Sequence, residues 1–281
     1  MYRIASKKIL NDNVTQMEIE APLVANKAQA GQFIILRVSE NGERIPLTVA
    51  GTDKEKGTVK IIFQVVGGTT MQLNAKKQGE YISDFVGPLG RATETAGVKN
   101  VCIVGGGVGC AIAMPVAREF HRIGAKVTSI IGFRNKDIVI LEDEFKACSD
   151  KLVVMTDDGS YGRHGNVTVP LKEMLAAGEK FDEIIAVGPL IMMKFVTLTA
   201  KGFGVPCTVS MNPIMIDGTG MCGGCRLTLH RNGERITKFA CVDGPDFNGY
   251  EVDFDEAMSR NLMYADFEKK ARDENCNLFK N

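Results

Sequence analysis

Residues 101–123 read VCIVGGGVGCAIAMPVAREFHRI, which is a short apolar strand, a glycine-rich turn and a segment with apolar positions at helical intervals. Glycines in such a turn let the backbone approach a pyrophosphate closely, and the helix that follows offers free N–H groups and the positive end of its dipole. A tight turn without a ligand would use glycine too, but the strand before it and the helix after it favour a dinucleotide-binding loop. The predicted nucleotide contacts in this loop are Gly105, Gly106, Gly107, Val108 and Gly109.

The sequence after this stretch continues the alternation of strand and helix. Short apolar runs recur as VTSII at 127–131, LVVM at 152–155 and IIAV at 184–187, with longer amphipathic stretches between them. This rhythm is typical of a parallel sheet with crossover helices. We therefore assign residues 97–212 to an α/β nucleotide-binding domain.

The ends of these strands carry residues suited to a dinucleotide, since ligands bind at the carboxyl edge of a parallel sheet. A carboxylate there can accept hydrogen bonds from ribose hydroxyls and would repel the extra phosphate of NADP, which favours NAD(H). The alternative is that Asp157 and Asp158 only open a turn with Gly159. The remaining predicted nucleotide contacts are Arg134, Asp157, Asp158, Gly188 and Pro189.

The first ninety or so residues alternate apolar and polar side chains in short runs, as in 14–20, 32–38 and 59–66. Several such strands separated by Gly and Pro predict a small antiparallel barrel over residues 1–96. Two segments in it carry donors and hydroxyls, RIPLT at 44–48 and VVGGTT at 65–70, the latter expected as a turn suited to a pyrophosphate. Composition alone does not identify a ligand for either, because a surface arginine is usually solvated and a glycine pair is often only a loop.

Three of the eight cysteines are clustered in a glycine-rich segment, where Asp217, Cys222, Cys225 and Cys241 follow the spacing D-x4-C-x2-C-x15-C. Plant-type [2Fe-2S] sites use C-x4-C-x2-C and a distant fourth cysteine, so the sequence predicts a cluster with aspartate in the first position. Zinc is the alternative for three cysteines and an aspartate. Cys207 is the other candidate for the fourth ligand, but VPCTVSM reads as a buried strand.

The rest of the C-terminal third is assigned by its position around the cysteines. We expect a cluster domain over 213–250 and a helical tail over 251–281, with Met258, Leu262 and Ala265 at helical spacing. His230 lies in LTLHRNGERIT, which predicts a hairpin with the histidine at its surface. The remaining cysteines, expected in the core, are Cys102, Cys110, Cys148, Cys207 and Cys276.

Charge and hydropathy exclude several classes of partner. The 281 residues contain 34 basic and 34 acidic side chains, so neither nucleic acid nor a membrane surface is an expected partner. The longest apolar runs are too short to span a bilayer, and the first residues lack the apolar region of a signal peptide. The expected location is the cytoplasm.

The order of these motifs resembles the ferredoxin-NADP reductase superfamily: R-x-P-L-T, GGTT, GPLG at 87–90, GGGVG and TDDGSYG. The resemblance implies an FAD-binding barrel followed by a nucleotide domain, with Arg44 at the flavin pyrophosphate and Thr48 near the isoalloxazine ring. It also implies room at Gly188 for the nicotinamide beside the flavin. The further flavin contacts carried over are Pro46, Leu47, Val49, Gln64, Val65, Gly68, Thr69 and Thr70.

With the cysteine motif included, the chain is similar to the electron-transfer subunits of dihydroorotate dehydrogenase. It is more similar to the small (alpha) subunits of NADH-dependent reduced ferredoxin:NADP oxidoreductases, which have aspartate at the first cluster position and a run like FACVDGPDFNGYEVDFDEAMSRN at 239–261. This resemblance implies a heterodimer with a larger flavin and iron-sulfur subunit, and electron bifurcation involving ferredoxin and NADP(H) in that partner.

The expected path is NADH, FAD, [2Fe-2S] cluster and partner, or the reverse, with no side chain needed as a catalytic acid or base because the cofactors carry the chemistry. One alternative is the dihydroorotate dehydrogenase electron-transfer subunit, against which Asp217 argues. Another is a cluster-carrying redox adaptor or sensor without NAD turnover, which the intact glycine loop disfavours.

Overall fold

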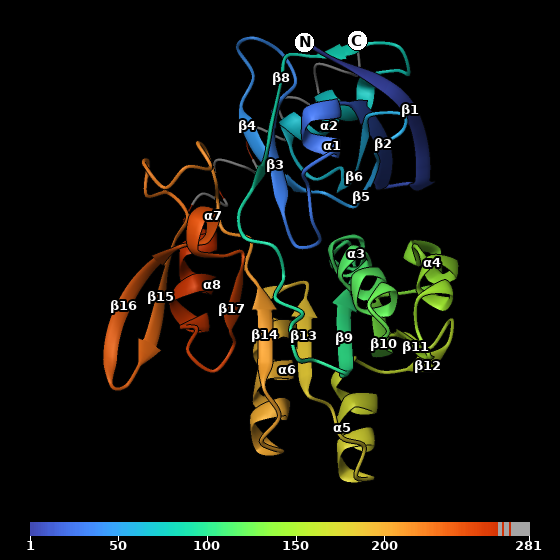
Figure 1. Cartoon of the computed structure of the whole chain (residues 1–281), viewed down its shortest axis with the longest axis vertical. Helices are drawn as coiled ribbons and strands as arrows, with labels where there is room; N and C mark the ends of the chain where they lie inside the picture. Colours follow the sequence, from blue (N-terminus) through green and yellow to red (C-terminus); the bar gives the residue numbers. More distant parts are fainter. Residues whose placement is uncertain (264–265, 267–269, 271–281) are drawn as a thin grey trace.

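The computed structural model describes residues 1–263, 266 and 270. In Figure 1 the N-terminal sheets lie above a larger sheet, and the C-terminal segments stand beside both. The predicted order of an antiparallel barrel, a parallel α/β domain and a small cysteine-rich C-terminal part is confirmed. Ala265 and Cys276, for which we predicted a helical and a core position, lie outside the described residues.

The N-terminal part consists of two antiparallel sheets around one core. Five strands form the order β5 (Gly51–Asp53), β6 (Thr58–Gln64), β2 (Val14–Glu20), β1 (Tyr2–Asn11) and β7 (Tyr81–Ile82). The second sheet has the order β4 (Arg44–Thr48), β3 (Phe33–Arg37) and β8 (Asp84–Leu89). Alternate side chains of both sheets, among them Met17, Ile34 and Phe63, are buried in the shared core, which explains the predicted alternation.

Two short helices, α1 (Pro22–Ala25) and α2 (Gly68–Ala75), connect strands of this part. The sequence predicted a turn at VVGGTT, but a helix begins at Gly68. The reason is local: the Thr70 hydroxyl accepts hydrogen bonds from the N–H groups of Val66 and Gly67, which satisfies donors at the helix start. The segment therefore presents a helix N-terminus.

The central sheet has seven strands, of which six are parallel. Their order is β12 (Arg163–His164), β11 (Lys151–Thr156), β10 (Lys126–Phe133), β9 (Asn100–Gly106), β13 (Glu183–Val187), β14 (Cys207–Ser210) and the antiparallel β17 (Asp246–Asn248). The predicted strands at 101–104, 127–131, 152–155 and 184–187 are all present. Strand β17 comes from the part of the chain that we assigned to the cluster domain.

Helices cover both faces of this sheet, as Figure 1 shows. On one face, Val101 and Ile103 pack with α3 (Gly109–Arg122) and α4 (Glu142–Ala147), which the short 3-10 helix η1 (Lys136–Ile138) precedes. On the other face, Cys102 and Val104 pack with α5 (Thr168–Ala176) and α6 (Leu190–Gly202). Burial on both faces explains why these strands are continuously apolar.

The C-terminal part begins with a hairpin, β15 (Arg226–Arg231) and β16 (Glu234–Phe239), which turns at Asn232 and Gly233. Both turn residues have positive φ, as a type I′ turn in a two-residue hairpin loop requires. His230 lies on it and pairs with Asp253 at the surface, as predicted. Helix α7 (Ala240–Asp243), strand β17 and helix α8 (Phe254–Leu262) follow.

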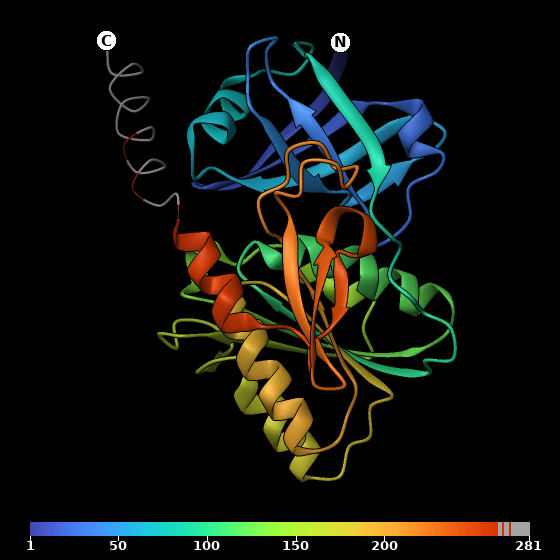
Figure 2. The same cartoon turned by 90° about the vertical axis from the view of Figure 1, so that its left-hand side faces the viewer.

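The loop between β14 and β15 reaches the N-terminal sheets, and Figure 2 shows it beside them. A side chain at Gly218 would meet Leu89 Cδ1 at 2.6 Å and Ile35 Cδ1 at 2.8 Å. The loop backbone therefore lies directly on strands β3 and β8. Close approach of this kind explains the glycine at position 218.

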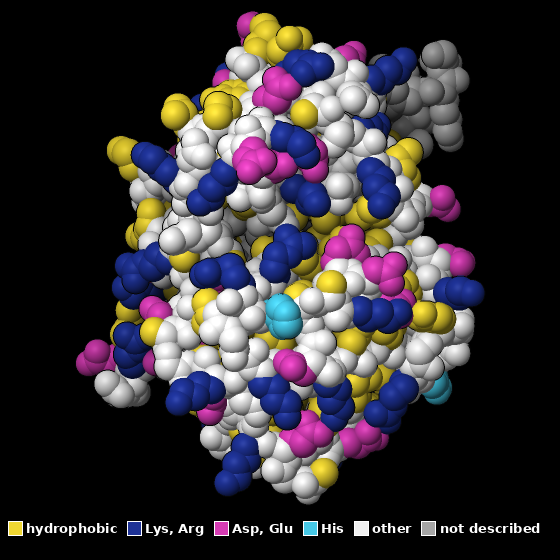
Figure 3. Space-filling view, turned by 45° about the vertical axis from the view of Figure 1, so that its right-hand side comes forward, with side chains coloured by type: hydrophobic (Ala, Val, Ile, Leu, Met, Phe, Trp, Pro, Cys, Tyr) yellow, Lys and Arg dark blue, Asp and Glu magenta, His cyan; other side chains and the backbone are white. Residues whose placement is uncertain are grey.

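Charged side chains of both signs are visible on the molecular surface (Figure 3). Basic and acidic side chains are interspersed on the face shown in Figure 3, so this face carries no extended area of one sign. In the part of the chain that the structure describes, no helix is both long and apolar enough to cross a membrane.

Candidate functional site

The glycine loop joins β9 to α3 at the carboxyl edge of the central sheet. A Cβ at Gly109 would lie 2.6 Å from the Val187 carbonyl oxygen, and one at Gly105 would lie 2.9 Å from Cys110 Sγ. Gly107 is different, because its φ is +56° and no atom lies within 4 Å of the Cβ position. Gly105 and Gly109 thus serve the packing of strand and helix, whereas Gly107 leaves open space for a ligand.

Gly188, at the end of β13, lies against the same loop. Its Cβ position is 3.1 Å from the Gly106 carbonyl oxygen and 2.9 Å from Met192 Cε. The two backbones are therefore in contact at the ends of neighbouring strands, with Pro189 as the N-cap of α6. The structure brings the predicted residues Gly106, Gly188 and Pro189 together.

The predicted ribose site lies where β10 and β11 end. The Asp158 carboxylate accepts hydrogen bonds from the Ser160 N–H at 2.9 Å and from its hydroxyl at 2.6 Å, and these bonds lower the pKa of Asp158. The exposed Asp157 carboxylate has no hydrogen bond or ion pair among the described residues. Arg134 is also exposed, and its carbonyl accepts the Asp158 N–H. Asp158 thus shapes the turn, as in the alternative interpretation, and Asp157 is the carboxylate left for a ligand.

A cavity of about 250 Å³ lies where the three parts of the chain meet. One wall comes from β3, β4, β6 and α2, and a second from Val108 and Ile112. The third comes from the end of β14, the segment after it and Pro245 before β17. The predicted contacts that line this cavity are Pro46, Leu47, Thr48, Gln64, Thr70 and Val108. Apolar walls with a few hydroxyls and amides suit a flat aromatic ligand.

Other predicted flavin contacts lie outside the lining. Val49 is 3% exposed and belongs to the N-terminal core. The Thr69 hydroxyl donates to Glu43 Oε2 at 3.0 Å, while Val65 and Gly68 flank the start of α2. Arg44 is exposed at the start of β4, where its side chain is free to reach a pyrophosphate.

The third wall was not predicted from the sequence. It is formed by Ser210, Met211, Asn212, Met215 and Pro245. These residues have no periodic pattern. Ser210 ends the last parallel strand, Met211 to Met215 lead from it to the cysteine loop, and Pro245 precedes β17. Met215 precedes Asp217 by two positions, so the same short segment borders the cavity and leads to the cysteines.

The cysteine loop is tightly folded by glycines, since Gly218, Gly220 and Gly223 all have positive φ. The Asp217 carboxylate accepts hydrogen bonds from the N–H groups of Thr219 at 2.9 Å and Cys222 at 2.7 Å. These bonds lower the pKa of Asp217, so the group is an anion at neutral pH. Cys222 is exposed, and its sulfur accepts the Gly224 N–H.

Cys225 and Cys241 form a buried pair with their sulfurs 3.2 Å apart. Burial and the neighbouring Cys225 together raise the pKa of the Cys241 thiol to about 12. Two thiolates bound to one tetrahedral metal ion at about 2.3 Å lie about 3.8 Å apart, somewhat farther than the two sulfurs here. Within residues 1–263, 266 and 270, no three potential ligands converge on one point. The pair thus fits one metal ion, with Cys222 and Asp217 on the adjoining loop.

Cys207 lies away from this pair. It is buried in β14, as predicted, and its sulfur is 3.6 Å from the Thr197 hydroxyl of α6. Cys102, Cys110 and Cys148 are also buried core residues, which confirms that prediction. The fold brings Cys225 and Cys241 together, whereas the Cys207 sulfur contacts α6 at Thr197.

Comparisons with known proteins agree with this arrangement. The sequence model of one family, the iron-sulfur cluster binding domain of dihydroorotate dehydrogenase B, matches residues 212–253. An uncharacterized protein of Clostridium beijerinckii is 50% identical over 97% of this chain and 93% of its own. The dihydroorotate dehydrogenase B (NAD(+)) electron transfer subunit homolog of Thermotoga maritima is 49% identical over 96% and 93%.

A solved structure of an NADH-dependent reduced ferredoxin-NADP oxidoreductase, reported for its insights into flavin-based electron bifurcation, contains a similar chain. The two chains are 47% identical with a TM-score of 0.90, over 98% of this chain and 97% of the other. The similarity therefore extends over both the sheets and the cysteine segment.

Proposed function

The chain belongs to the family of dihydroorotate dehydrogenase B electron-transfer subunits and their homologues, and on that premise we propose that it passes electrons between NAD(H) and a larger partner subunit. Its cofactors are FAD and a [2Fe-2S] cluster. It is an NAD(H)-dependent flavin and iron-sulfur oxidoreductase subunit within the ferredoxin-NADP reductase superfamily. The residue roles that follow are part of the proposal.

The observation that carries the proposal is the cavity shared by all three parts of the chain. Thr48 comes from the N-terminal sheets, Val108 from the glycine loop, and Met215 from the segment that leads to Asp217. A ligand in this cavity would border both the nucleotide site and the cysteine loop. That position suits the cofactor that must exchange electrons with both.

FAD supplies the conversion between the two electrons of a hydride and the single electrons that an iron-sulfur cluster accepts. The chain's own residues bind and orient the groups. Arg44 would pair with the pyrophosphate, since an exposed guanidinium matches phosphate oxygens. The N-terminus of α2 and the Thr48 hydroxyl would supply further donors.

For the nucleotide, we propose that the open face of Gly107 and the N-terminus of α3 receive the pyrophosphate. Asp157 would accept hydrogen bonds from a ribose and select NAD(H) over NADP(H). Gly188 and Gly106, at the ends of β13 and β9, are in contact and have no side chains. The nicotinamide would approach the cavity past these two residues.

For the cluster, Asp217, Cys222, Cys225 and Cys241 are the proposed ligands. The adjacent thiols of Cys225 and Cys241, and the N–H groups of the glycine-rich loop, are the donors that such a cluster uses. We propose an FAD region over residues 1–96, an NAD region over 97–212, a cluster region over 213–250 and a tail over 251–281. Strand β17 belongs to the cluster region by sequence but joins the sheet of the NAD region.

The proposed assembly is a heterodimer with a larger flavin and iron-sulfur subunit, in which ferredoxin and NADP(H) would react. The high identity to a chain of an NADH-dependent reduced ferredoxin-NADP oxidoreductase supports an electron-bifurcating complex. Asp217, in place of the first cysteine, favours this assembly over a dihydroorotate dehydrogenase complex. Copurification of the native partner from the source cells, followed by assay of that complex, distinguishes the two.

The test of the subunit's own function uses isolated protein under anaerobic conditions. Addition of NADH should bleach the flavin absorbance within the mixing time of a manual experiment. A redox adaptor or sensor without NAD turnover would keep an oxidised flavin spectrum. That second result would contradict the proposed function.

A further inference from the structure

Asp246 on β17 is half-buried, with its carboxyl group close to strand β14 and to the segment that carries Thr93. The Thr93 hydroxyl donates a hydrogen bond to Asp246 Oδ2 at 2.6 Å, and the Ser210 side chain is its second hydrogen-bonding neighbour. Ser210 and Asp246 are register partners in the antiparallel pairing of β14 with β17. Burial raises the pKa of Asp246 in spite of these hydrogen bonds.

Ser210 connects this carboxyl group to the proposed flavin cavity. It lines the cavity next to Met211 and Asn212, at the end of β14. Asp246 is therefore one hydrogen-bonding side chain away from the space in which the flavin would lie. The mechanism proposed above assigns neither residue a role.

A second carboxyl group, that of Glu183 on β13, interacts electrostatically with Asp246. It accepts a hydrogen bond from the Thr208 hydroxyl at 2.5 Å, and burial raises its pKa. Among the described residues, Glu183 forms no hydrogen bond with Asp246. Asp246 has its own route to solvent, because it lines a cavity at the surface.

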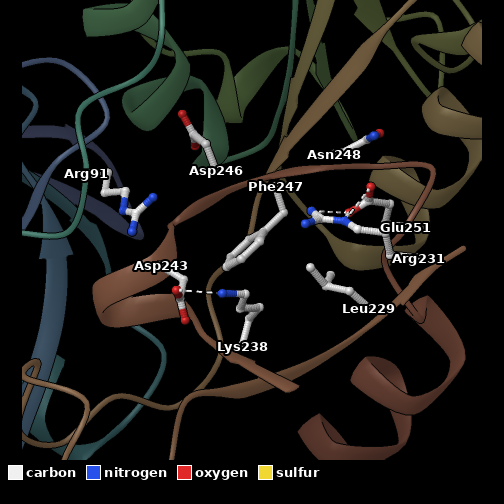
Figure 4. A pocket seen from close by; sticks show the side chains of 9 residues that line it. All are labelled: Arg91, Leu229, Arg231, Lys238, Asp243, Asp246, Phe247, Asn248 and Glu251. Carbon is white, nitrogen blue, oxygen red and sulfur yellow. Dashed lines mark hydrogen bonds and ion pairs between the residues drawn. The ribbon is translucent and has the colours of Figure 1, made fainter. Parts of the chain in front are cut away.

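The charged groups near Asp246 leave it without a cationic partner. Figure 4 shows a surface cavity of about 240 Å³ in which Arg231 pairs with Glu251 and Lys238 pairs with Asp243, while the Asp246 carboxyl turns away from both pairs. Arg91 lines this cavity too, and its Nε donates to the Val242 carbonyl. Among the described residues, none forms an ion pair with Asp246.

The proposed function requires a group near the flavin that accepts a proton. Oxidation of NADH to NAD⁺ delivers two electrons and one proton, and only the electrons continue to the cluster, one at a time. One proton per NADH must therefore leave the flavin cavity. We propose that Asp246, reached through the Ser210 hydroxyl, accepts this proton and releases it to solvent through the surface cavity that it lines.

The test rests on the proposed function and uses the protein loaded with flavin and cluster. NADH is mixed anaerobically with the protein and ferricyanide, a one-electron acceptor, in weakly buffered solution that contains a pH-indicator dye. Each NADH then reduces two ferricyanide ions and releases one proton. Flavin bleaching, ferricyanide reduction and dye response are followed together, and infrared difference spectra of oxidised and reduced protein record protonated carboxyl groups.

In unmodified protein, proton release should keep pace with electron transfer. Asp246→Asn and Ser210→Ala should each delay proton release about tenfold or more relative to the flavin bleaching measured in the same variant, because a positioned proton acceptor contributes at least that factor. The comparison within each variant is needed because Ser210 also lines the flavin cavity. Ser210→Thr, which keeps the hydroxyl, should keep the ratio of the two rates found in unmodified protein. Glu251→Gln is the matched control, since this carboxylate lines the same surface cavity but is held in its own ion pair with Arg231.

The infrared measurement gives a readout independent of turnover. A carboxyl band that responds to reduction should be present in unmodified protein, shift in Ser210→Ala and disappear in Asp246→Asn. Ser210→Ala carries the test if Asp246→Asn does not fold. Prompt proton release and an unchanged band in these variants would overturn the proposal alone, whereas unmodified protein that NADH does not bleach would overturn it together with the proposed function.

Discussion

The sulfur atoms of Cys225 and Cys241 lie 3.2 Å apart, although the residues are sixteen positions apart in the chain. The hairpin between them explains this, because Arg226 at the start of β15 is paired with Phe239 at the end of β16. Cys225 directly precedes the hairpin and Cys241 comes shortly after it, so both lie at its open end. Its length sets the spacing of the last two cysteines in the motif.

Replacement of either member of this pair by serine should abolish cluster binding, because one thiolate ligand is lost from a buried site. Cys225→Ser and Cys241→Ser protein should contain little iron or acid-labile sulfide and lack the visible absorbance of the cluster. Cys207→Ala is the control, since Cys207 contacts Thr197 in the sheet core and should leave iron content unchanged. Stoichiometric zinc without sulfide in unmodified protein would contradict the assignment.

Asp217 is expected to be the fourth ligand of the cluster. Because its carboxylate also accepts two hydrogen bonds in the loop, different replacements distinguish its role as a ligand from its role in the loop structure. Asp217→Ala should weaken cluster retention, and Asp217→Asn should do so too, although asparagine can still accept one of the loop hydrogen bonds. Asp217→Cys should retain a [2Fe-2S] cluster with a changed reduction potential and spectrum, because ligand identity controls both. Redox titration and absorbance spectra check this. Loss of the cluster in Cys207→Ala, with an unchanged spectrum in Asp217→Ala, would contradict it.

Gly107→Ala should weaken NADH binding far more than it lowers stability. The added methyl group meets no protein atom, so the cost is the positive φ, about 1 kcal/mol, whereas the methyl would enter the space for the pyrophosphate. Gly178→Ala is a matched control, with φ +86° and equally open surroundings at the end of α5. The midpoint temperature of thermal unfolding should fall by a similar amount in both variants, while only Gly107→Ala should raise the KM for NADH. Equal KM values would exclude the loop from nucleotide binding.

Asp157→Ser should reduce the preference for NADH over NADPH by about tenfold or more, because a carboxylate that repels the 2′-phosphate is removed. Asp158→Ser should mainly loosen the turn, since Asp158 bonds Ser160. Changing Asp157 to Ser and Asp158 to Arg together should narrow the preference further. The rates of flavin reduction by both nucleotides measure this effect. Equal rates in unmodified protein would refute the role of Asp157.

The order of strands and helices could be predicted from the periodicity of apolar residues, which is a local property of the sequence. Alternation in β2 reflects burial mainly on one face, and the continuously buried runs in β9 and β10 reflect packing on both faces. The start of α2 at Gly68 was missed because the Thr70 hydroxyl caps it, a contact that composition alone did not indicate.

The site was predictable only where motifs mark it. Glycines and cysteines have few structural substitutes, so Gly107 and Cys225 were found from spacing. Met211 and Pro245 border the cavity because separate segments fold against one another, and a sequence has no local signal for such contacts. The same holds for Asp246, which accepts a hydrogen bond from Thr93 in a distant segment.

Anaerobic titration of the isolated, unmodified protein with NADH tests the whole account most directly. The flavin and the cluster should together accept about three electrons per chain, two into the flavin and one into the cluster. The end point should coincide with a paramagnetic signal of the reduced cluster, from protein that contains one FAD, two irons and two sulfides per chain. An end point without that signal, or an oxidised flavin at excess NADH, would contradict electron transfer from NAD(H) through FAD to the cluster.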